Sequence, residues 1–162
     1  MNTASFAMPE FNRQILDLLT GGKAHLSFES AFAEVPDESW NRIPERQPHS
    51  LWHLLEHMRI CQWDLLRFSV DPTHKSPQFP DGYWPDLERE VNQDQWQFSL
   101  SEFRRDADEF QSLIMNTGDL SADFPHAPGY SLLREALILA DHNAYHLGQV
   151  VSLRRTLGIW QD

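Results

Sequence analysis

Apolar residues recur at three- and four-residue steps in four stretches of the chain, the spacing that gathers them on one side of an α-helix. The clearest stretch runs from Ser131 to about Leu157 and contains no proline. A second begins at Ser50, a residue type that caps helix N-termini, and ends before Asp71. Both stretches are predicted to form long amphipathic helices.

Two further stretches carry the same pattern. One covers about Asp94 to Met115, with aromatic and aliphatic residues along one side. Its charged residues are expected to face water: Arg104, Arg105, Asp106 and Asp108. The other covers about Pro9 to Glu34, but Gly21 and Gly22 each cost about 1 kcal/mol relative to alanine inside a helix. We therefore expect a break or bend at the two glycines.

The connecting segments, residues 35–49, 71–93 and 116–130, hold most of the prolines, and none alternates apolar and polar residues as a strand does. They are predicted to be loops. The chain is thus expected to be all-α: one domain over residues 1–162, a four-helix bundle with long loops between helices 1 and 2 and between helices 2 and 3. The aromatic residues of segment 78–96 are expected to cover an edge of the core, with a lid over the bundle as the alternative.

The composition narrows the classes of function. The 162 residues carry 13 Lys and Arg against 24 Asp and Glu, a formal net charge of -11, so a nucleic-acid backbone would be repelled. No window approaches the roughly 18 uninterrupted apolar residues of a membrane span. Residues Met1 to Glu10 show no secretory signal pattern, and Cys61, the one cysteine, has no disulfide partner in the chain. We expect a cytoplasmic protein with neither nucleic-acid nor membrane partners.

Five of the eight histidines fall into two groups on predicted helices: His49, His53 and His57 in the first, His142 and His146 in the second. Residues four apart lie on one face of a helix, about 6 Å apart along its axis, so two such imidazoles can share a metal ion. Three in a row cannot, because the outer two are about 12 Å apart and Zn–N bonds measure about 2.0–2.1 Å. A metal site therefore needs ligands from both helices.

The direction of each side chain selects the third ligand. At about 100° per residue, His142 and His146 point towards the apolar side of their helix. On the other helix, His57 lies at the edge of the apolar arc and His53 lies farther from it, so His57 is the better partner. Three neutral imidazoles would leave the ion its charge and an open coordination position, as in catalytic sites. The competing interpretation is that these histidines are ordinary hydrogen-bonded polar residues.

Other metal motifs fit less well. The run from His53 to His57 matches the H-x-x-E-H pattern of zinc proteases, with Glu56 as the general base, but this leaves the second histidine pair without a task. A dinuclear carboxylate site needs Glu-x-x-His pairs, and no histidine has a glutamate three residues before it. Cys61 is expected to be a small core residue.

Two runs of sequence resemble the DinB-like family of metal-binding four-helix proteins: SLWHLLEHMRI at 50–60 and DHNAYHLGQ at 141–149. The likeness extends over nearly the whole chain, including the runs GGKAH at 21–25, YWP at 83–85 and LRR at 153–155. In that family one histidine of the second helix and two of the fourth hold a divalent metal ion. Carried over, these are His57, His142 and His146, and the ion implied is zinc, nickel or iron.

Relatives in this family include transferases that use low-molecular-weight thiols such as bacillithiol, mycothiol or glutathione, and many members have no known reaction. The resemblance implies a metal-dependent transferase or hydrolase that acts on a small electrophilic substrate, with such a thiol as a candidate cofactor. The candidate catalytic residues are Glu135, Gln149, Tyr145 and His53. Their alternative role is structural, such as holding a ligand imidazole by its second nitrogen. His25 would approach only if the first helix bends at the glycines.

The alternative function is a non-catalytic domain in which the ion fixes helix packing and the protein acts through association. Trp52, Ile60 and Trp63 lie opposite the apolar arc of their helix and need a cover. A homodimer, which we expect, or the aromatic loop would supply that cover.

Overall fold

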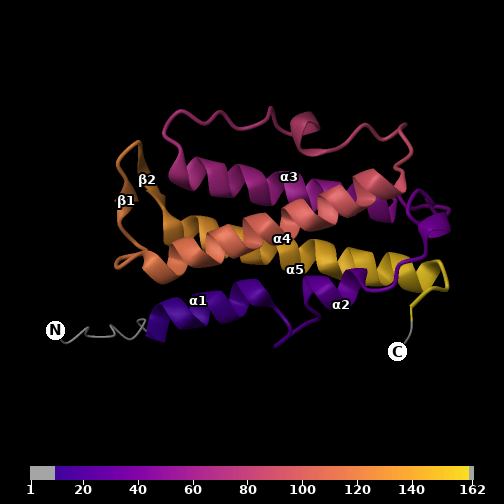
Figure 1. Cartoon of the computed structure of the whole chain (residues 1–162), viewed down its shortest axis with the longest axis horizontal. Helices are drawn as coiled ribbons and strands as arrows, with labels where there is room; N and C mark the ends of the chain where they lie inside the picture. Colours follow the sequence, from indigo (N-terminus) through magenta and orange to yellow (C-terminus); the bar gives the residue numbers. More distant parts are fainter. Residues whose placement is uncertain (1–9, 161–162) are drawn as a thin grey trace.

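The computed structural model describes residues 10–160, so the N-terminal segment searched for a secretory signal lies almost wholly outside it. Its α-helices are α1 (Glu10–Thr20), α2 (Phe28–Phe32), α3 (Leu51–Val70), α4 (Gln93–Asn116) and α5 (Leu132–Thr156). Its shorter elements are the 3₁₀ turns η1 (Asp37–Ser39) and η2 (Asp81–Tyr83) and the strands β1 (Asp123–Phe124) and β2 (Ala127–Ser131). In Figure 1, α3, α4 and α5 run along the long axis, and α1 and α2 follow one another beneath them. The fold is all-α apart from one small hairpin.

The first helical stretch is divided at the two glycines, as predicted. Gly21 and Gly22, which follow α1, adopt φ angles of 72° and 78°, in the left-handed region that favours glycine. α2 begins at Phe28 behind Ser27, whose hydroxyl accepts a hydrogen bond from the N–H of Ser30 at 3.2 Å. α1 and α2 together occupy the place of the first bundle helix (Figure 1).

The N-terminus of α3 is fixed by Ser50, as predicted, together with His53. The Ser50 hydroxyl accepts a hydrogen bond from the His53 N–H, and the Ser50 N–H donates to His53 Nδ1, both at 3.2 Å. Such reciprocal caps usually carry Glu or Gln at the position of His53. The cap fixes where α3 starts.

The prediction of a loop over residues 116–130 is wrong for the second half of this segment. β1 and β2 form an antiparallel hairpin in which Phe124 pairs with Ala127. Strands of two and five residues, the longer containing a proline and a glycine, are too short to show an alternating pattern in the sequence. The hairpin is joined to α3 by His126, whose Nε2 donates to the carbonyl oxygen of Phe68 at 2.9 Å.

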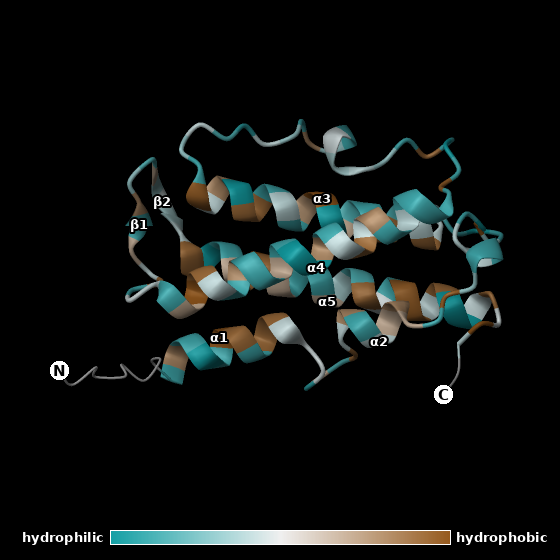
Figure 2. Cartoon of the chain, viewed as in Figure 1, coloured by the Kyte–Doolittle hydropathy of each residue, from teal (hydrophilic) through white to brown (hydrophobic). Residues whose placement is uncertain are grey.

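The core consists of two clusters of buried side chains. The larger joins α2, α3, α4 and the C-terminal half of α5, and includes the stacked rings of Trp40 and Trp96, with centroids 4.8 Å apart. The smaller joins α1 to the opposite ends of α3, α4 and α5, around Leu66 and Phe110. Figure 2 shows hydrophobic residues on the sides of the helices that face one another. On α5, His142 and His146 lie between Leu139 of the smaller cluster and Leu147 of the larger one.

One charged side chain expected to face water is buried instead. Asp106 is inaccessible to solvent, and its Oδ1 accepts a hydrogen bond from Arg105 Nη2 at 3.0 Å. Asp106 lies three residues after Phe103 and four before Phe110, both of which are core residues. This spacing places Asp106 on the apolar side of α4. The prediction that it faces water was wrong because it followed from the charge of the residue and not from its position on the helix.

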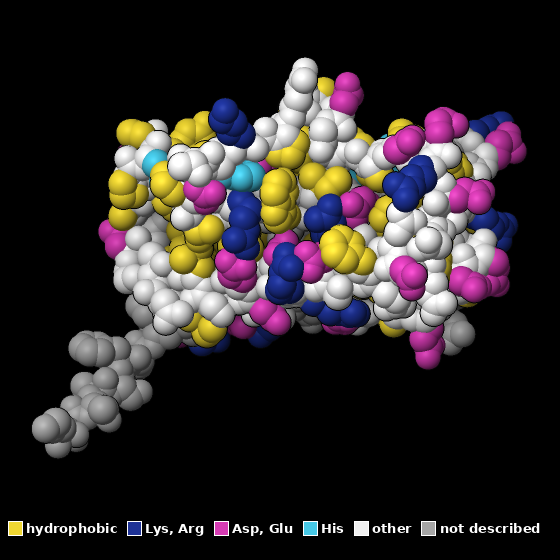
Figure 3. All heavy atoms as spheres, turned by 45° about the horizontal axis from the view of Figure 1, so that its top comes forward, with side chains coloured by type: hydrophobic (Ala, Val, Ile, Leu, Met, Phe, Trp, Pro, Cys, Tyr) yellow, Lys and Arg dark blue, Asp and Glu magenta, His cyan; other side chains and the backbone are white. Residues whose placement is uncertain are grey.

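The face that carries segment 71–92 is mixed in character. Figure 3 shows Lys and Arg side chains interspersed with Asp and Glu, and hydrophobic side chains between them. Within residues 10–160, none of the helices combines the length and the apolar character needed to cross a bilayer.

Candidate metal centre

Three predicted ligands converge between α3 and α5. His57 Nε2 lies 3.1 Å from His146 Nε2 and 3.1 Å from His142 Nε2. His57 comes from the middle of α3, and the other two come from successive turns of α5. Nitrogen ligands around a tetrahedral zinc ion, with bonds of about 2.0–2.1 Å, would be roughly 3.4 Å apart. The observed spacing is close to that value.

The outer nitrogen of two of these rings is already engaged. His57 Nδ1 donates to the carbonyl oxygen of Tyr83 at 2.7 Å, and His146 Nδ1 donates to Gln149 Oε1 at 2.9 Å. Because a neutral imidazole carries one N–H proton, here on Nδ1, Nε2 of each ring has a free lone pair. These lone pairs face each other at 3.1 Å with no proton between them. In the third ring, Nδ1 of His142 is buried without a hydrogen bond of good geometry, but the adjacent Asn143 amide interacts with this ring and raises its pKa.

All three rings are neutral near pH 7. Burial, together with repulsion between neighbouring imidazoles, lowers the pKa of His142 and the pKa of His146 to about 4 each. Burial also lowers the pKa of His57, against the opposing effect of its bond to Tyr83. Protonation therefore does not relieve the contact at neutral pH, and neutral imidazole is the form that binds divalent cations.

Cys61 is buried, as expected for a small core residue, and it also belongs to the same cluster. Its Sγ lies 3.7 Å from His57 Nδ1 and 3.8 Å from His57 Nε2. His57, Cys61 and the half-buried His142 form a group whose ligand atoms lie within 4.8 Å of one another, and this group could hold a metal ion. Burial and the nearby Asp64 carboxylate raise the pKa of the thiol to about 12. The available sequence signal was its position four residues after His57.

Segment 71–92 covers the histidines, and its Trp84 also packs against the larger core cluster, whose edge the aromatic residues were expected to cover. The Trp84 ring stacks on His57, with centroids 3.8 Å apart and an interplanar angle of 3°, and on His49 at 4.0 Å. In Figure 1 this segment runs along the outer side of α3 and includes η2. Trp96, grouped with these aromatic residues in the sequence, lies instead in the core as part of α4.

Asp64, a buried carboxylate of α3, anchors the covering segment. One of its oxygens accepts a hydrogen bond from the Tyr83 hydroxyl and the other from His74 Nε2, both at 2.7 Å. Because the carbonyl of Tyr83 also accepts from His57 Nδ1, one residue connects Asp64 to the histidine cluster. Sequence reasoning missed this connection, since periodicity does not give the path of a loop.

A cavity of about 430 Å³ opens beside the histidines. The side chains that line it are His57, Cys61, Phe79, Pro80, Tyr83, Trp84, Ile138, Asp141, His142, Tyr145 and His146. Within the described chain, this lining contains neither Lys nor Arg, and Asp141 is its one carboxylate. The cavity thus has mainly apolar and aromatic walls and a cluster of nitrogen lone pairs at one side.

The candidate catalytic residues on α5 fall in different places. Gln149 holds the outer nitrogen of His146, which is the structural role considered for it. Tyr145 lines the cavity, packs edge-on against His146 and is 64% exposed. Glu135 is buried, pairs with Arg134 at 2.6 Å and lines a separate cavity.

His53 and His25 lie away from the converging nitrogens. His53 is buried in the α3 cap, and His25 lies at the surface. Glu56, the general base of the zinc-protease alternative, accepts a hydrogen bond from the Ser99 hydroxyl of α4 at 2.6 Å. These contacts leave the H-x-x-E-H run without the arrangement that its motif requires.

The chain itself covers the outer tryptophans of α3. Trp52 belongs to the larger core cluster together with Trp40 and Val91, which come from the two long connections. Trp63 packs edge-on against His74 of the covering segment, with centroids 5.1 Å apart. These tryptophans therefore no longer support a homodimer, which stays a prediction.

Comparison with known families identifies the class of protein. The family model of the DinB superfamily matches residues 24–150, a range that contains all three converging histidines. The chain belongs to the DinB superfamily, as its sequence motifs indicated. No curated protein and no solved structure gives a significant match.

Proposed function

We propose that this protein is a divalent-metal-dependent enzyme whose metal ligands are His57, His142 and His146. The observation that carries the proposal is the pair of lone pairs on His57 and His146, 3.1 Å apart, with both outer nitrogens engaged as donors. Two such lone pairs repel each other unless a cation lies between them. His142 can present its Nε2 lone pair to the same ion when its proton lies on Nδ1, beside the Asn143 amide.

Three imidazoles suit a cation better here than a set that includes Cys61. Without a metal ion the thiol, whose pKa is raised to about 12, is protonated at neutral pH and must lose its proton to bind a cation, whereas the imidazoles are already deprotonated. The sulfur lies 3.8 Å from His57 Nε2, the nitrogen proposed as a ligand, so the Cys61→Ser variant tests its part directly. Imidazole donors suit zinc, nickel and iron alike, so the ligand set indicates a divalent transition metal without selecting one element.

The proposed reaction is transfer of a low-molecular-weight thiol to a small electrophile, or hydrolysis of that electrophile. A divalent cation at this place supplies Lewis acidity, which makes a water or a thiol a stronger nucleophile at neutral pH. The residues of the chain bind and orient the substrate. Trp84 and Phe79 give the cavity aromatic walls, and Asp141, the one carboxylate of its described lining, would accept the proton that the nucleophile releases.

Elemental analysis of untagged protein tests the ligand set. We expect stoichiometric metal in the wild type and its loss in His57→Ala, His142→Ala and His146→Ala. His53→Ala and Cys61→Ser are matched controls on the same helix and should keep the metal. Undiminished metal in His142→Ala, or loss in Cys61→Ser equal to that in the histidine variants, would contradict the assignment.

Catalysis is tested separately, with a panel of thiol-transfer and hydrolysis assays run with and without a chelator. We expect turnover that the chelator abolishes, and that Asp141→Asn lowers while its metal content stays unchanged. In the non-catalytic alternative, the chelator would lower thermal stability and no substrate in the panel would turn over.

A further inference from the structure

Two aromatic side chains that line the histidine cavity are left largely in water. Phe79 is 82% exposed and Tyr145 is 64% exposed, and both line the cavity of about 430 Å³. Phe79 belongs to segment 71–92 and Tyr145 to α5. Ile138, which is also exposed, lines the same cavity two turns before Tyr145 on α5. Single exposed apolar residues are ordinary, but several gathered at one hollow indicate a binding surface.

Neither of these two rings is held by the core, since both lie outside the two clusters of buried side chains. The centroid of the Phe79 ring lies 6.2 Å from that of Tyr83, at an interplanar angle of 60°. Tyr145 meets His146 edge-on, with centroids 5.0 Å apart. Neither contact is a parallel stack, so a planar ring can still stack on Phe79 and on Tyr145.

Trp84, another large ring of the lining, is covered on both faces. It stacks on His57 and on His49, with centroids 3.8 and 4.0 Å away. Two imidazoles at this distance cannot share one face of an indole without overlapping, so they lie on opposite faces. Trp84 therefore offers the cavity only its edge, and a ligand finds its stacking surface on the two exposed rings.

The charges of the lining favour a ligand whose body is uncharged. Within the described residues, the lining has neither Lys nor Arg, and Asp141 is its one carboxylate. The proposed ion would bring positive charge only to the histidine side of the cavity, where the reacting atom binds. A carboxylate or phosphate farther from the histidines would lose water and gain no cationic partner.

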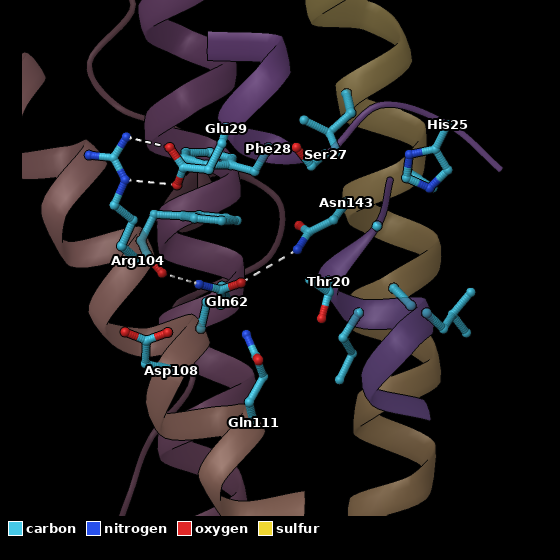
Figure 4. A pocket seen from close by; sticks show the side chains of 18 residues that line it. Thr20, His25, Ser27, Phe28, Glu29, Gln62, Arg104, Asp108, Gln111 and Asn143 are labelled. Carbon is cyan, nitrogen blue, oxygen red and sulfur yellow. Dashed lines mark hydrogen bonds and ion pairs between the residues drawn. The ribbon is translucent and has the colours of Figure 1, made fainter. Parts of the chain in front are cut away.

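The groups that line a second cavity, of about 280 Å³ on the other side of α5, are already paired (Figure 4). Its phenyl rings, Phe28 and Phe103, stack on each other with centroids 3.8 Å apart. Dashed lines in Figure 4 join Gln62 to the carbonyl oxygen of Phe103 and Arg104 to Glu29. These paired groups give a ligand no specific partner, in contrast to the two exposed rings beside the histidines.

We propose that the histidine cavity binds a planar, uncharged aromatic ring, and that Phe79 and Tyr145 are the residues that select it. In the proposed reaction this ring belongs to the electrophile, a step that rests on the proposed function. The substrate class is therefore an uncharged aromatic electrophile. A volume of about 430 Å³ accommodates one ring or two fused rings together with the group that reacts. Stacking on an aromatic side chain contributes about two- to tenfold in affinity beyond the apolar area that it buries.

Fluorine NMR of the full-length protein, labelled with 3-fluorotyrosine and loaded with zinc, tests the proposal. The chain has three tyrosines, so the signals of Tyr145 and Tyr83, which line the cavity, can be followed beside that of Tyr130, which lines another. The probes are benzyl alcohol and cyclohexylmethanol, which have similar size but of which only the first is planar. We expect benzyl alcohol to shift the Tyr145 signal saturably and to leave the Tyr130 signal unchanged.

The ratio of the two affinities, benzyl alcohol over cyclohexylmethanol, isolates the effect of the rings. Phe79→Leu and Tyr145→Leu keep an apolar side chain but remove the ring, so each should lower this ratio at least about twofold. Binding to Tyr145→Leu is followed on the Tyr83 signal. Phe98→Leu is the matched control, because Phe98 is 56% exposed on α4 and does not line the cavity, and it should keep the wild-type ratio.

The same titration after removal of the metal with a chelator separates this proposal from the proposed function. Stacking does not require the ion, so the ratio and its dependence on the two rings should persist. A chain that holds no zinc and keeps the ratio would contradict the metal-dependent function and support the selection of aromatic rings. Absence of a saturable shift at Tyr145, or one ratio shared by the wild type, Phe79→Leu and Tyr145→Leu, would overturn the proposal.

Discussion

Replacement of Asp64 by alanine should destabilise the protein and weaken metal binding together. The carboxylate is 5% exposed and accepts hydrogen bonds from Tyr83 and from His74, both at 2.7 Å. Hydrogen bonds to a charged group contribute about 1.5–3 kcal/mol each, but both donors sit on a surface segment and regain water when released. We therefore expect the free energy of unfolding of the metal-free protein to fall by about 2–4 kcal/mol.

The effect on the metal follows from the same geometry. Once Tyr83 is released, its carbonyl no longer holds His57 Nδ1, and loss of such an outer partner typically weakens metal binding about 10- to 100-fold. Urea unfolding measures the first effect, and competition with a chromophoric chelator measures the second. Asp81→Ala, an exposed acid of the same segment, removes the same charge and should change neither value. A loss below about 0.5 kcal/mol with unchanged metal affinity would refute the reasoning.

Three further predictions concern the site and the core. The free energy of unfolding of the metal-free protein should fall as the pH drops from about 6.5 towards 4, because His142 and His146 bind protons in the unfolded chain, whereas their pKa in the folded protein is lowered to about 4. Urea titrations at pH 7 and pH 5 measure this fall, which should be smaller in the His142→Gln/His146→Gln variant. An equal fall in that variant would argue against these two residues as the source. Gln149→Ala should weaken metal binding about 10- to 100-fold in a folded protein, whereas Gln149→Glu, which keeps an acceptor for His146, should bind nearly as the wild type. Phe110→Ala should lower the free energy of unfolding by about 3–5 kcal/mol, since the ring is 1% exposed in the smaller core cluster; a loss under about 1 kcal/mol would mean that this part of the core is not packed as described.

Local patterns in the sequence predicted most of the helical architecture. The steps of three and four residues located α3, α4 and α5, and the glycine pair located the break between α1 and α2. The same periodicity selected His57 over His53 as the partner of the α5 histidines, and the structure brings those three rings together. Their role as metal ligands is the proposal made above. These predictions succeeded because each depends on residues within one or two helical turns.

The features that were missed depend on contacts between distant segments. The covering segment 71–92 contributes Tyr83, His74 and Trp84, and no periodic pattern specifies where such a loop lies. Glu135 has the right helical direction, but it sits too far along α5 and pairs with Arg134 in another cavity. Cys61 was judged by its small size, although its spacing from His57 had already placed it beside the cluster.

The central claim is that the inward nitrogens of α3 and α5 share one cation. A crystal structure of the metal-loaded protein, with anomalous data collected at the absorption edge of the metal found by elemental analysis, tests it most directly. We predict a single anomalous peak bonded to Nε2 of His57, His142 and His146, at about 2.0–2.1 Å if the metal is zinc. A peak bonded to Cys61 Sγ in place of one of these nitrogens, or no peak between the two helices, would contradict the account.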